Sequence, residues 1–150
     1  MKLKQITIAI ENAPGRLYEV THALGEAGIN LRALSLVDTG AFGQLRLLVS
    51  DVAKARRILM GMHMPAQVND VVAVEIEDKP GSLAKMLRPL KDAHVQVLYT
   101  YAFVGFSQGR AVMIFSFSDN DRAIQILQEN GMQLLDAEAF GILDSTNNGK

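Results

Sequence analysis

The sequence contains no cysteine, which excludes disulfides, thiolate nucleophiles and cysteine metal sites. Neither sign of charge dominates, because 15 basic and 16 acidic side chains leave a formal net charge of −1. This balance gives no electrostatic reason to expect nucleic acid or an anionic membrane as a partner. No apolar run approaches the roughly 20 residues that a membrane helix needs, and the alternating start is unlike a signal peptide. We therefore expect a soluble cytoplasmic protein that binds no metal and no other cofactor.

Apolar residues are plentiful, and an internal repeat shows how they are organised. They make up 49% of the 150 residues, enough for one ordinary domain or two small ones. Residues 10–17 (IENAPGRL) return as residues 76–83 (IEDKPGSL), a shift of 66 positions. The shift becomes 68 where Ser50-Asp51 recurs as Ser118-Asp119, so we expect two extra residues in a hairpin near residues 105–109. The sequence therefore predicts two tandem copies of one folded unit.

Periodicity predicts the same elements in each copy. Apolar residues alternate over residues 3–11, which is typical of a strand, whereas Leu17, Val20 and Leu24 have helical spacing and Gly28 is placed to end the helix. The first copy is predicted to hold strands at residues 3–11, 29–37, 44–50 and from 67, with helices at 15–28 and 51–61. The second is predicted to hold strands at residues 71–77, 95–104, 110–117 and 133–139, with helices through 83–90 and 119–127. Pro89 is expected to bend its helix.

The order β-α-β-β-α-β, read twice, predicts the fold class. It is typical of a ferredoxin-like unit, an α+β fold with an antiparallel sheet and both helices on one face. We divide the chain into modules at residues 1–70 and 71–144, followed by a loose polar tail at 145–150. The strand at residues 29–37 is apolar on both sides. Its second face should therefore be covered by the sister copy, another chain or a partner protein.

Two pairs of segments resemble a known family. Residues 11–17 (ENAPGRL) with 27–30 (AGIN), and 77–83 (EDKPGSL) with 93–96 (AHVQ), are similar to the ACT domain, an amino-acid-binding regulatory module. The resemblance covers nearly the whole chain. It implies a tandem ACT protein with sheets paired side by side. It also implies ligands at the seam between the strand-one/helix-one loop of one module and strand two of the other.

The Pro-Gly turn supports this assignment on physical grounds. Gly15 allows close backbone approach, and the N–H groups of Gly15, Arg16 and Leu17 at a helix N-terminus should attract a carboxylate. The candidate ligand-binding residues of the first copy are Asn12, Ala13, Pro14, Gly15, Arg16, Leu17, Asn30 and Leu31. Those of the second copy are Asp78, Lys79, Pro80, Gly81, Ser82, Leu83, Gln96 and Val97.

The ligand's ammonium group needs acceptors, and we expect them at the Asn12 or Asp78 side chain or at strand-two carbonyls. The second copy departs from the family pattern with His94 and Gln96, which puts its pocket in doubt. A plain alternative is that Pro-Gly merely makes a tight turn. The methionines and histidine at residues 60–64 could suit copper, but they fit better as a packed helix end.

The favoured function is a sensor: a small molecule, expected to be an amino acid, binds at the module interface and alters assembly or partner contact. The expected partners are a second copy in a homodimer and a regulated protein that the sequence does not name. One alternative is a structural interaction module with vestigial sites. Another is a small acyl-phosphate hydrolase using Arg16 and Asn30, although no glycine-rich phosphate cradle precedes Arg16 and Ser82 replaces it in the second copy. No residue is assigned a catalytic role.

Overall fold

The computed structural model describes residues 1–142, apart from the side chains of residues 104–107. Two compact units divide the chain. We call Lys4–Asn69, with the segment from Ala137, the first unit, and Asp70–Asp136, with Met1–Leu3, the second unit. The expected division at 1–70 and 71–144 stays a prediction, and the tail at 145–150 lies outside the described residues. No helix within residues 1–142 is long and apolar enough to cross a membrane.

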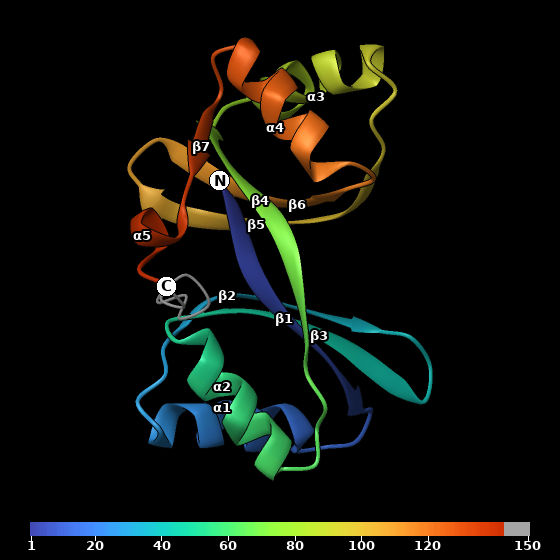
Figure 1. The fold of residues 1–150 in the computed structure, drawn as a ribbon, viewed down its shortest axis with the longest axis vertical. Helices are drawn as coiled ribbons and strands as arrows, with labels where there is room; N and C mark the ends of the chain where they lie inside the picture. Colours follow the sequence, from blue (N-terminus) through green and yellow to red (C-terminus); the bar gives the residue numbers. More distant parts are fainter. Residues whose placement is uncertain (143–150) are drawn as a thin grey trace, which may run out of the picture. The chain divides into compact units, whose positions relative to one another are not determined.

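The first unit has the predicted order of elements. They are β1 (Lys2–Glu11), α1 (Arg16–Glu26), β2 (Leu31–Asp38), β3 (Phe42–Val49), α2 (Val52–Gly61), the start of β4 (Gln67–Glu77) and α5 (Ala137–Phe140). Both β1 and β2 pair antiparallel with β3, so that β3 lies between them. Helices α1 and α2 cover one face of these strands (Figure 1). The unit is therefore the expected antiparallel sheet with helices on one face.

Burial follows the periodicity in the first unit. Ile6, Ile8 and Ile10 of β1 are buried on one face of the strand, and Val20 and Leu24 of α1 are buried against the core. The second helix begins with the predicted cap, since Asp51 accepts a hydrogen bond from Lys54 N at 3.1 Å. Such a cap is worth about 1 kcal/mol because it satisfies one of the unpaired N–H groups at the helix start.

The second unit repeats the arrangement. Its elements are the rest of β4, α3 (Ser82–Asp92), β5 (Val97–Ser107), β6 (Arg110–Phe117), α4 (Asn120–Glu129) and β7 (Gln133–Leu135). The strand order is β5-β6-β4-β7, with every neighbouring pair antiparallel. Helices α3 and α4 lie on one face of these strands (Figure 1). This is the ferredoxin-like order that the sequence predicts.

One predicted strand differs in length. We expected a strand over residues 133–139, but β7 ends at Leu135 and the chain then forms the short helix α5. The physical reason is local, because alanine and glutamate at residues 137–139 favour a helix over a strand. The side chain of Phe140 at the end of α5 is buried. The bend expected at Pro89 stays a prediction, since α3 continues through that residue.

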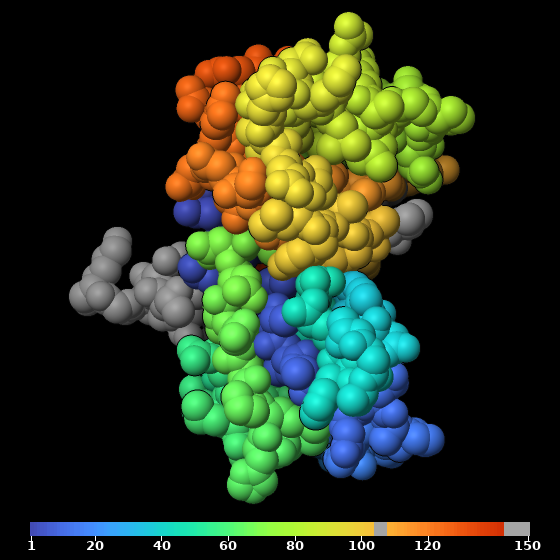
Figure 2. Space-filling view, turned by 90° about the vertical axis from the view of Figure 1, so that its right-hand side faces the viewer, coloured from blue at the N-terminus to red at the C-terminus, as the bar shows by residue number. Residues whose placement is uncertain are grey.

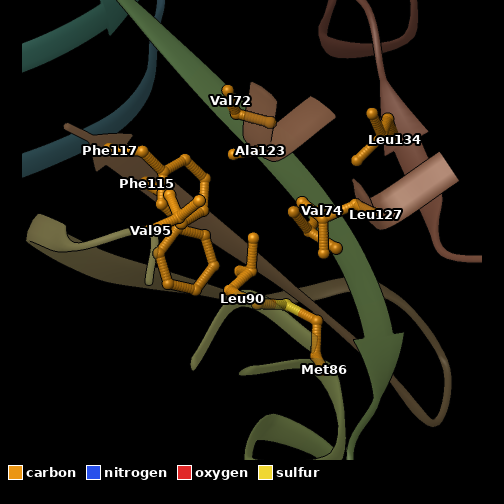
Figure 3. Packing of buried hydrophobic residues seen from close by; sticks show 10 residues of the cluster. All are labelled: Val72, Val74, Met86, Leu90, Val95, Phe115, Phe117, Ala123, Leu127 and Leu134. Atoms are coloured by element: carbon orange, nitrogen blue, oxygen red, sulfur yellow. The ribbon is translucent and has the colours of Figure 1, made fainter. Parts of the chain in front are cut away.

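The core of the second unit lies between its sheet and its helices (Figure 3). The rings of Phe115 and Phe117 on β6 stack with their centroids 5.1 Å apart. Met86 and Leu90 of α3 reach this core from one side, and Leu127 of α4 completes it. All five side chains are almost fully buried. Each therefore contributes about 1.5–3 kcal/mol of hydrophobic stabilisation.

Histidine 94 occupies a backbone conformation that favours glycine. Its φ angle is 58°, and the equivalent residue of the first copy, Gly28, has a φ of 78°. A residue with a Cβ atom loses about 1–2 kcal/mol in this left-handed region, partly offset because glycine loses more freedom on folding. We therefore expect His94→Gly to raise the free energy of unfolding by about 0.5–1 kcal/mol, measured by urea denaturation. Gly28→His should have the opposite effect, and a destabilised His94→Gly variant would contradict the prediction.

Candidate functional site

A cavity of about 230 Å³ opens in the first unit beside the predicted Pro-Gly turn. It lies where the end of β1, the start of α1 and the β2–β3 hairpin meet. Its lining residues are Ile10, Glu11, Asn12, Ala13, Arg16, Leu17, Leu36, Asp38 and Gly43. In Figure 2 the blue and cyan segments that carry these residues adjoin. Four of the predicted site residues thus share one cavity with residues of a distant hairpin.

The turn has the geometry that an anion site needs. Gly15 adopts a φ of 86° immediately before α1, and a Cβ atom added there would meet nothing within 4 Å. The N–H of Arg16 donates to Ala13 O at 3.3 Å, and Glu19 N donates to Gly15 O at 2.9 Å. Within residues 1–142, the N–H groups of Gly15 and Leu17 donate to no protein group. Two of the three amides in the predicted cradle are therefore available to a ligand.

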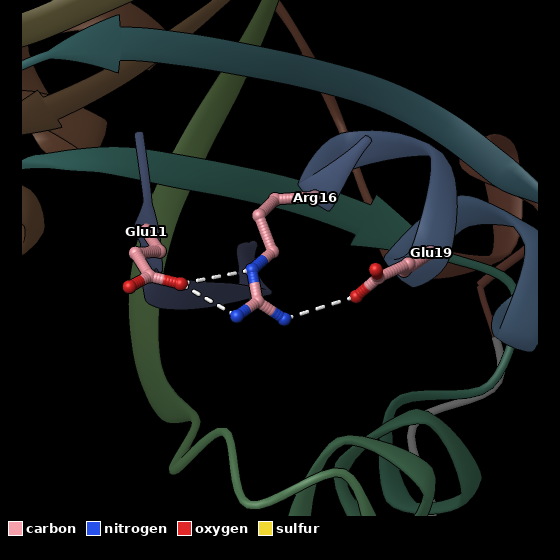
Figure 4. Close-up of polar contacts among 3 residues, drawn as sticks. All are labelled: Glu11, Arg16 and Glu19. Atoms are coloured by element: carbon pink, nitrogen blue, oxygen red, sulfur yellow. Dashed lines mark hydrogen bonds and ion pairs between the residues drawn. The ribbon is translucent and has the colours of Figure 1, made fainter. Parts of the chain in front are cut away.

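The Arg16 side chain is committed to two carboxylates (Figure 4). Its Nε and Nη2 atoms donate to Glu11 Oε2 at 3.0 and 2.5 Å, and Nη1 donates to Glu19 Oε2 at 3.1 Å. The hydrogen bond to Glu11, followed by the one to Glu19, raises the pKa of the guanidinium above its ordinary value. The positive charge of Arg16 is therefore balanced inside the loop, which leaves the backbone amides as the carboxylate donors.

Asp38 places a carboxylate on the facing hairpin. Its Oδ1 atom accepts hydrogen bonds from Asn12 Nδ2 and from Gly40 N, both at 2.9 Å. Asn12 Nδ2 also donates to Gly40 O at 3.1 Å, and Asn12 N donates to Ala41 O at 3.1 Å. The predicted residue Asn12 thus ties the loop to the hairpin. Its Nδ2 atom already donates to protein oxygens. The Oδ1 atom of Asn12 is left to accept a hydrogen bond from a ligand.

Leu36, Asp38 and Gly43 line the cavity although none of them was predicted as a site residue. Their proximity follows from strand register, because Glu11 lies opposite Phe42 and Asp38 lies opposite Gly43. A hairpin turning at residues 39–41 must therefore bring its tip beside the end of β1. The pairing of residues 3–11 with residues 44–50 would have indicated this.

Asn30 and Leu31 lie at the other end of the first unit's sheet. Leu31 pairs with Val49, and Asn30 N donates to Ser50 Oγ at 2.8 Å. Within this unit the two residues therefore do not meet the cavity, and their role as ligand contacts stays a prediction. The same separation keeps Asn30 from Arg16, so this unit does not form the arginine–asparagine pair that the hydrolase alternative needs.

The second copy reproduces the turn. Gly81 has a φ of 87°, Ser82 N donates to Lys79 O at 3.3 Å, and Lys85 N donates to Gly81 O at 3.0 Å. Asp78 N donates to Gly109 O at 2.9 Å, as Asn12 N does to Ala41 O in the first copy. The remaining predicted residues of this copy follow the same pattern: Pro80 and Leu83 lie in the turn, and Gln96 and Val97 lie where β5 begins, opposite Phe117–Ser118.

The described residues contain no metal-binding cluster of side chains. No group of three histidine, aspartate or glutamate side chains there could hold a metal ion. Residues 60–64 end α2, with Met62 N donating to Ile58 O and His63 in a left-handed conformation at φ 60°. This methionine cluster therefore lies at a helix end as expected, although the side chain of Met60 is exposed rather than packed.

Comparison with known proteins decides the family. Residues 1–143 match the family model of an ACT domain pair. The chain belongs to this family. Among solved structures, this ACT domain pair is similar to protein BT0572 from Bacteroides thetaiotaomicron, with 37% identity over 95% of this chain and 98% of that chain and a TM-score of 0.89. No curated protein matches this ACT domain pair by sequence.

Regulatory subunits of aspartate kinase share the fold of this ACT domain pair. The subunit from Thermus thermophilus aligns with a TM-score of 0.60 and 18% identity over 84% of this chain and 90% of that chain. The subunit from Thermus flavus aligns with a TM-score of 0.59 and 19% identity over the same shares. At these identities the likeness concerns the fold alone.

Proposed function

We propose that this ACT domain pair is a regulatory sensor that binds an amino acid in the cavity of the first unit. The observation that carries the proposal is the pairing of opposite charges across a small cavity. Leu17 lines the cavity and has an unpaired N–H at the positive end of a helix, with the unpaired N–H of Gly15 two residues before it, and Asp38 lines the cavity from the facing hairpin. The α-carboxylate of the ligand binds the amides, and its ammonium group binds Asp38 and the side-chain oxygen of Asn12.

The expected affinity follows from the number of polar contacts. A hydrogen bond to a charged group contributes about 1.5–3 kcal/mol, so three or four of them approach the roughly 8 kcal/mol of a micromolar complex. The cavity volume of about 230 Å³ is below the roughly 300–1,000 Å³ of pockets for drug-sized ligands. Ile10 and Leu36 supply apolar walls. The site therefore suits a small metabolite with a short side chain.

Regulation requires that binding changes an assembly. Leu34, Leu36 and Val37 of β2, with Phe42 of β3, are between 44% and 53% exposed, Leu34 and Leu36 on one face of the hairpin and Val37 and Phe42 on the other. We propose that this hairpin contacts a second copy of the chain or a regulated protein in the cytoplasm, and that the ligand alters the contact. The regulatory role of the aspartate kinase subunits that share this fold supports the proposal.

A thermal-shift screen of the twenty amino acids on ligand-free protein tests the proposal. A ligand at about one hundred times its Kd adds about 2.7 kcal/mol to the stability of the folded state. For a chain of this size we expect the melting temperature to rise by several degrees with one amino acid or a few related ones. If no amino acid shifts the melting temperature, the proposal is wrong.

Two matched glycine variants locate the site. Valine at Gly15 or at Gly81 meets the same backbone strain, about 1–3 kcal/mol, because the two φ angles are 86° and 87°. We expect Gly15→Val to abolish the ligand-induced shift and Gly81→Val to retain it, measured against the melting temperature of each ligand-free variant. The reverse pattern would place the amino acid in the second copy and contradict the assignment to the first.

The exposed apolar hairpin also favours a second candidate, a structural interaction module whose sites are vestigial. Sedimentation velocity with and without the amino acid found in the screen separates the two functions. A sensor changes its association state or its affinity for a partner when the ligand is added. An interaction module associates to the same extent in both conditions.

A further inference from the structure

The second unit contains a separate cavity of about 390 Å³. It lies between the end of β4, the first turns of α3 and the turn that joins α4 to β7, and Arg110 of β6 also lines it. Ile76, Glu77, Lys79 and Ser82 of this lining are the repeat equivalents of Ile10, Glu11, Ala13 and Arg16, which line the first unit's cavity. The two cavities therefore share the end of the first strand and the Pro-Gly turn, but the β2–β3 hairpin completes one and the α4–β7 turn with Arg110 completes the other.

The charge of this cavity differs from that of the equivalent place in the first copy. Ser82 and Lys85 line it, and the repeat places them where the first copy has Arg16 and Glu19. In the first copy the long Arg16 side chain reaches across to its two carboxylate partners (Figure 4). Serine is too short to do so, and lysine reverses the charge of the glutamate. The second copy has thus exchanged an arginine held by two carboxylates for a more basic lining.

Among the described residues that line the cavity, one cationic side chain has no ion-pair partner. Glu75 Oε1 accepts from Arg110 Nε at 3.2 Å, and Glu77 Oε2 accepts from Lys79 Nζ at 2.5 Å. Within residues 1–142, the side chain of Lys85 has neither an ion-pair nor a hydrogen-bond partner. The Lys79 hydrogen bond is the main cause that lowers the pKa of Glu77, and the charges of Arg110 and Lys85 add to it. Three cationic side chains therefore face two carboxylates.

The balance of donors and acceptors identifies the ligand class. Lys85, the terminal nitrogens of Arg110 and the hydroxyl of Ser82 can donate, whereas both carboxylates are already paired with cations. An ammonium group would find no free carboxylate here, unlike in the first unit. The side chains of Ile76 and Met132 provide apolar wall. We propose that this cavity binds a small organic carboxylate without an amino group, held by Lys85, Arg110 and Ser82.

An NMR titration of the ¹⁵N-labelled full chain tests the proposal with succinate and, separately, inorganic phosphate. We expect succinate to shift the backbone N–H signals of Ser82, Gly131 and Met132 in a saturable manner, because these residues line the cavity. Phosphate should bind more weakly, since it cannot use the apolar wall. No saturable shift with succinate would overturn the proposal, and tighter binding of phosphate than of succinate would overturn the carboxylate assignment.

Variants taken from the first copy provide the decisive comparison. Ser82→Arg combined with Lys85→Glu gives this cavity the residues of the first copy, an arginine that pairs with carboxylates and a glutamate in place of the lysine donor, and should weaken succinate binding by more than about tenfold. Lys91→Glu makes the charge change of Lys85→Glu at a position of α3 outside the cavity and should leave binding nearly unchanged. If the double variant fails to fold, Lys85→Gln at an exposed position serves in its place. Unchanged succinate binding in a folded cavity variant, or an equal loss in Lys91→Glu, would overturn the proposal.

The carboxylate cavity and the proposed amino-acid site are in different units, and one variant distinguishes them in the same titration. Gly15→Val lies in the first unit and is expected to leave succinate binding intact while it abolishes amino-acid binding. If no amino acid shifts the melting temperature, the amino-acid site is wrong but the carboxylate cavity is unaffected. If succinate does not bind, the carboxylate cavity is wrong but the amino-acid site is unaffected.

Discussion

Asp38→Asn is expected to lower the affinity for the amino acid by about 10–100-fold, because the ammonium group of the ligand loses a charged acceptor worth about 1.5–3 kcal/mol. The substitution is conservative for the fold. Asparagine keeps an Oδ1 atom that can accept from Asn12 Nδ2 and Gly40 N, as aspartate does at 2.9 Å. Isothermal titration calorimetry with the amino acid identified by thermal shift measures the change in Kd.

A matched variant separates this contact from a general loss of negative charge. Asp92→Asn removes the same charge from the exposed end of α3, away from the residues that line the first unit's cavity. Its Kd should stay within about twofold of the unsubstituted protein, as for most surface changes. An Asp38→Asn variant with unchanged affinity would show that Asp38 does not hold the ammonium group.

Phe115→Ala should lower the free energy of unfolding by about 3–5 kcal/mol, the largest effect on stability that we expect from a single substitution. The Phe115 side chain is only 1% exposed and packs on Phe117 in the core of the second unit (Figure 3). Alanine would leave a void that the neighbouring side chains can fill only in part. Urea denaturation followed by far-ultraviolet circular dichroism measures the loss.

The same substitution at an exposed phenylalanine is the control. Phe42 begins β3 and is 53% exposed, so Phe42→Ala removes the same atoms from a site that is largely in water. We expect a cost below about 1 kcal/mol. If both alanine variants lose equal stability, burial in the core is not what Phe115 contributes.

The fold was largely predictable because each copy carries the same pattern in different residues. Ile6, Ile8 and Ile10 alternate as a strand must, and the Asp51 cap recurs at Asp119, which accepts from Arg122 N at 3.0 Å. Repetition removes the ambiguity that a single short apolar run would carry. The strand expected at residues 133–139 was wrong beyond Leu135 because local helix preference and the burial of Phe140 prevail there.

The site was predictable only in its local part. The turn at Gly15 follows from residues that are adjacent in the chain, and its left-handed conformation needs no distant contact. Asp38 reaches the cavity because β2 pairs with β3. The residues of the turn, 11–17, give no information about this pairing. The partnership of Arg16 with Glu19 was within reach of sequence reasoning, because residues three apart on a helix are neighbours. The ligand-binding role of each candidate residue stays a prediction.

Strand β4 has a consequence for the evolution of this chain. It begins in the first unit and continues into the second without a break from Gln67 to Glu77. A gene cut at residue 70 would divide β4 between two fragments, and the fragment 1–70 would also lack the segment from Ala137 that belongs to the same unit. Neither half of the sequence repeat therefore coincides with a compact unit, and loss of one copy from the gene would leave the other with an incomplete strand.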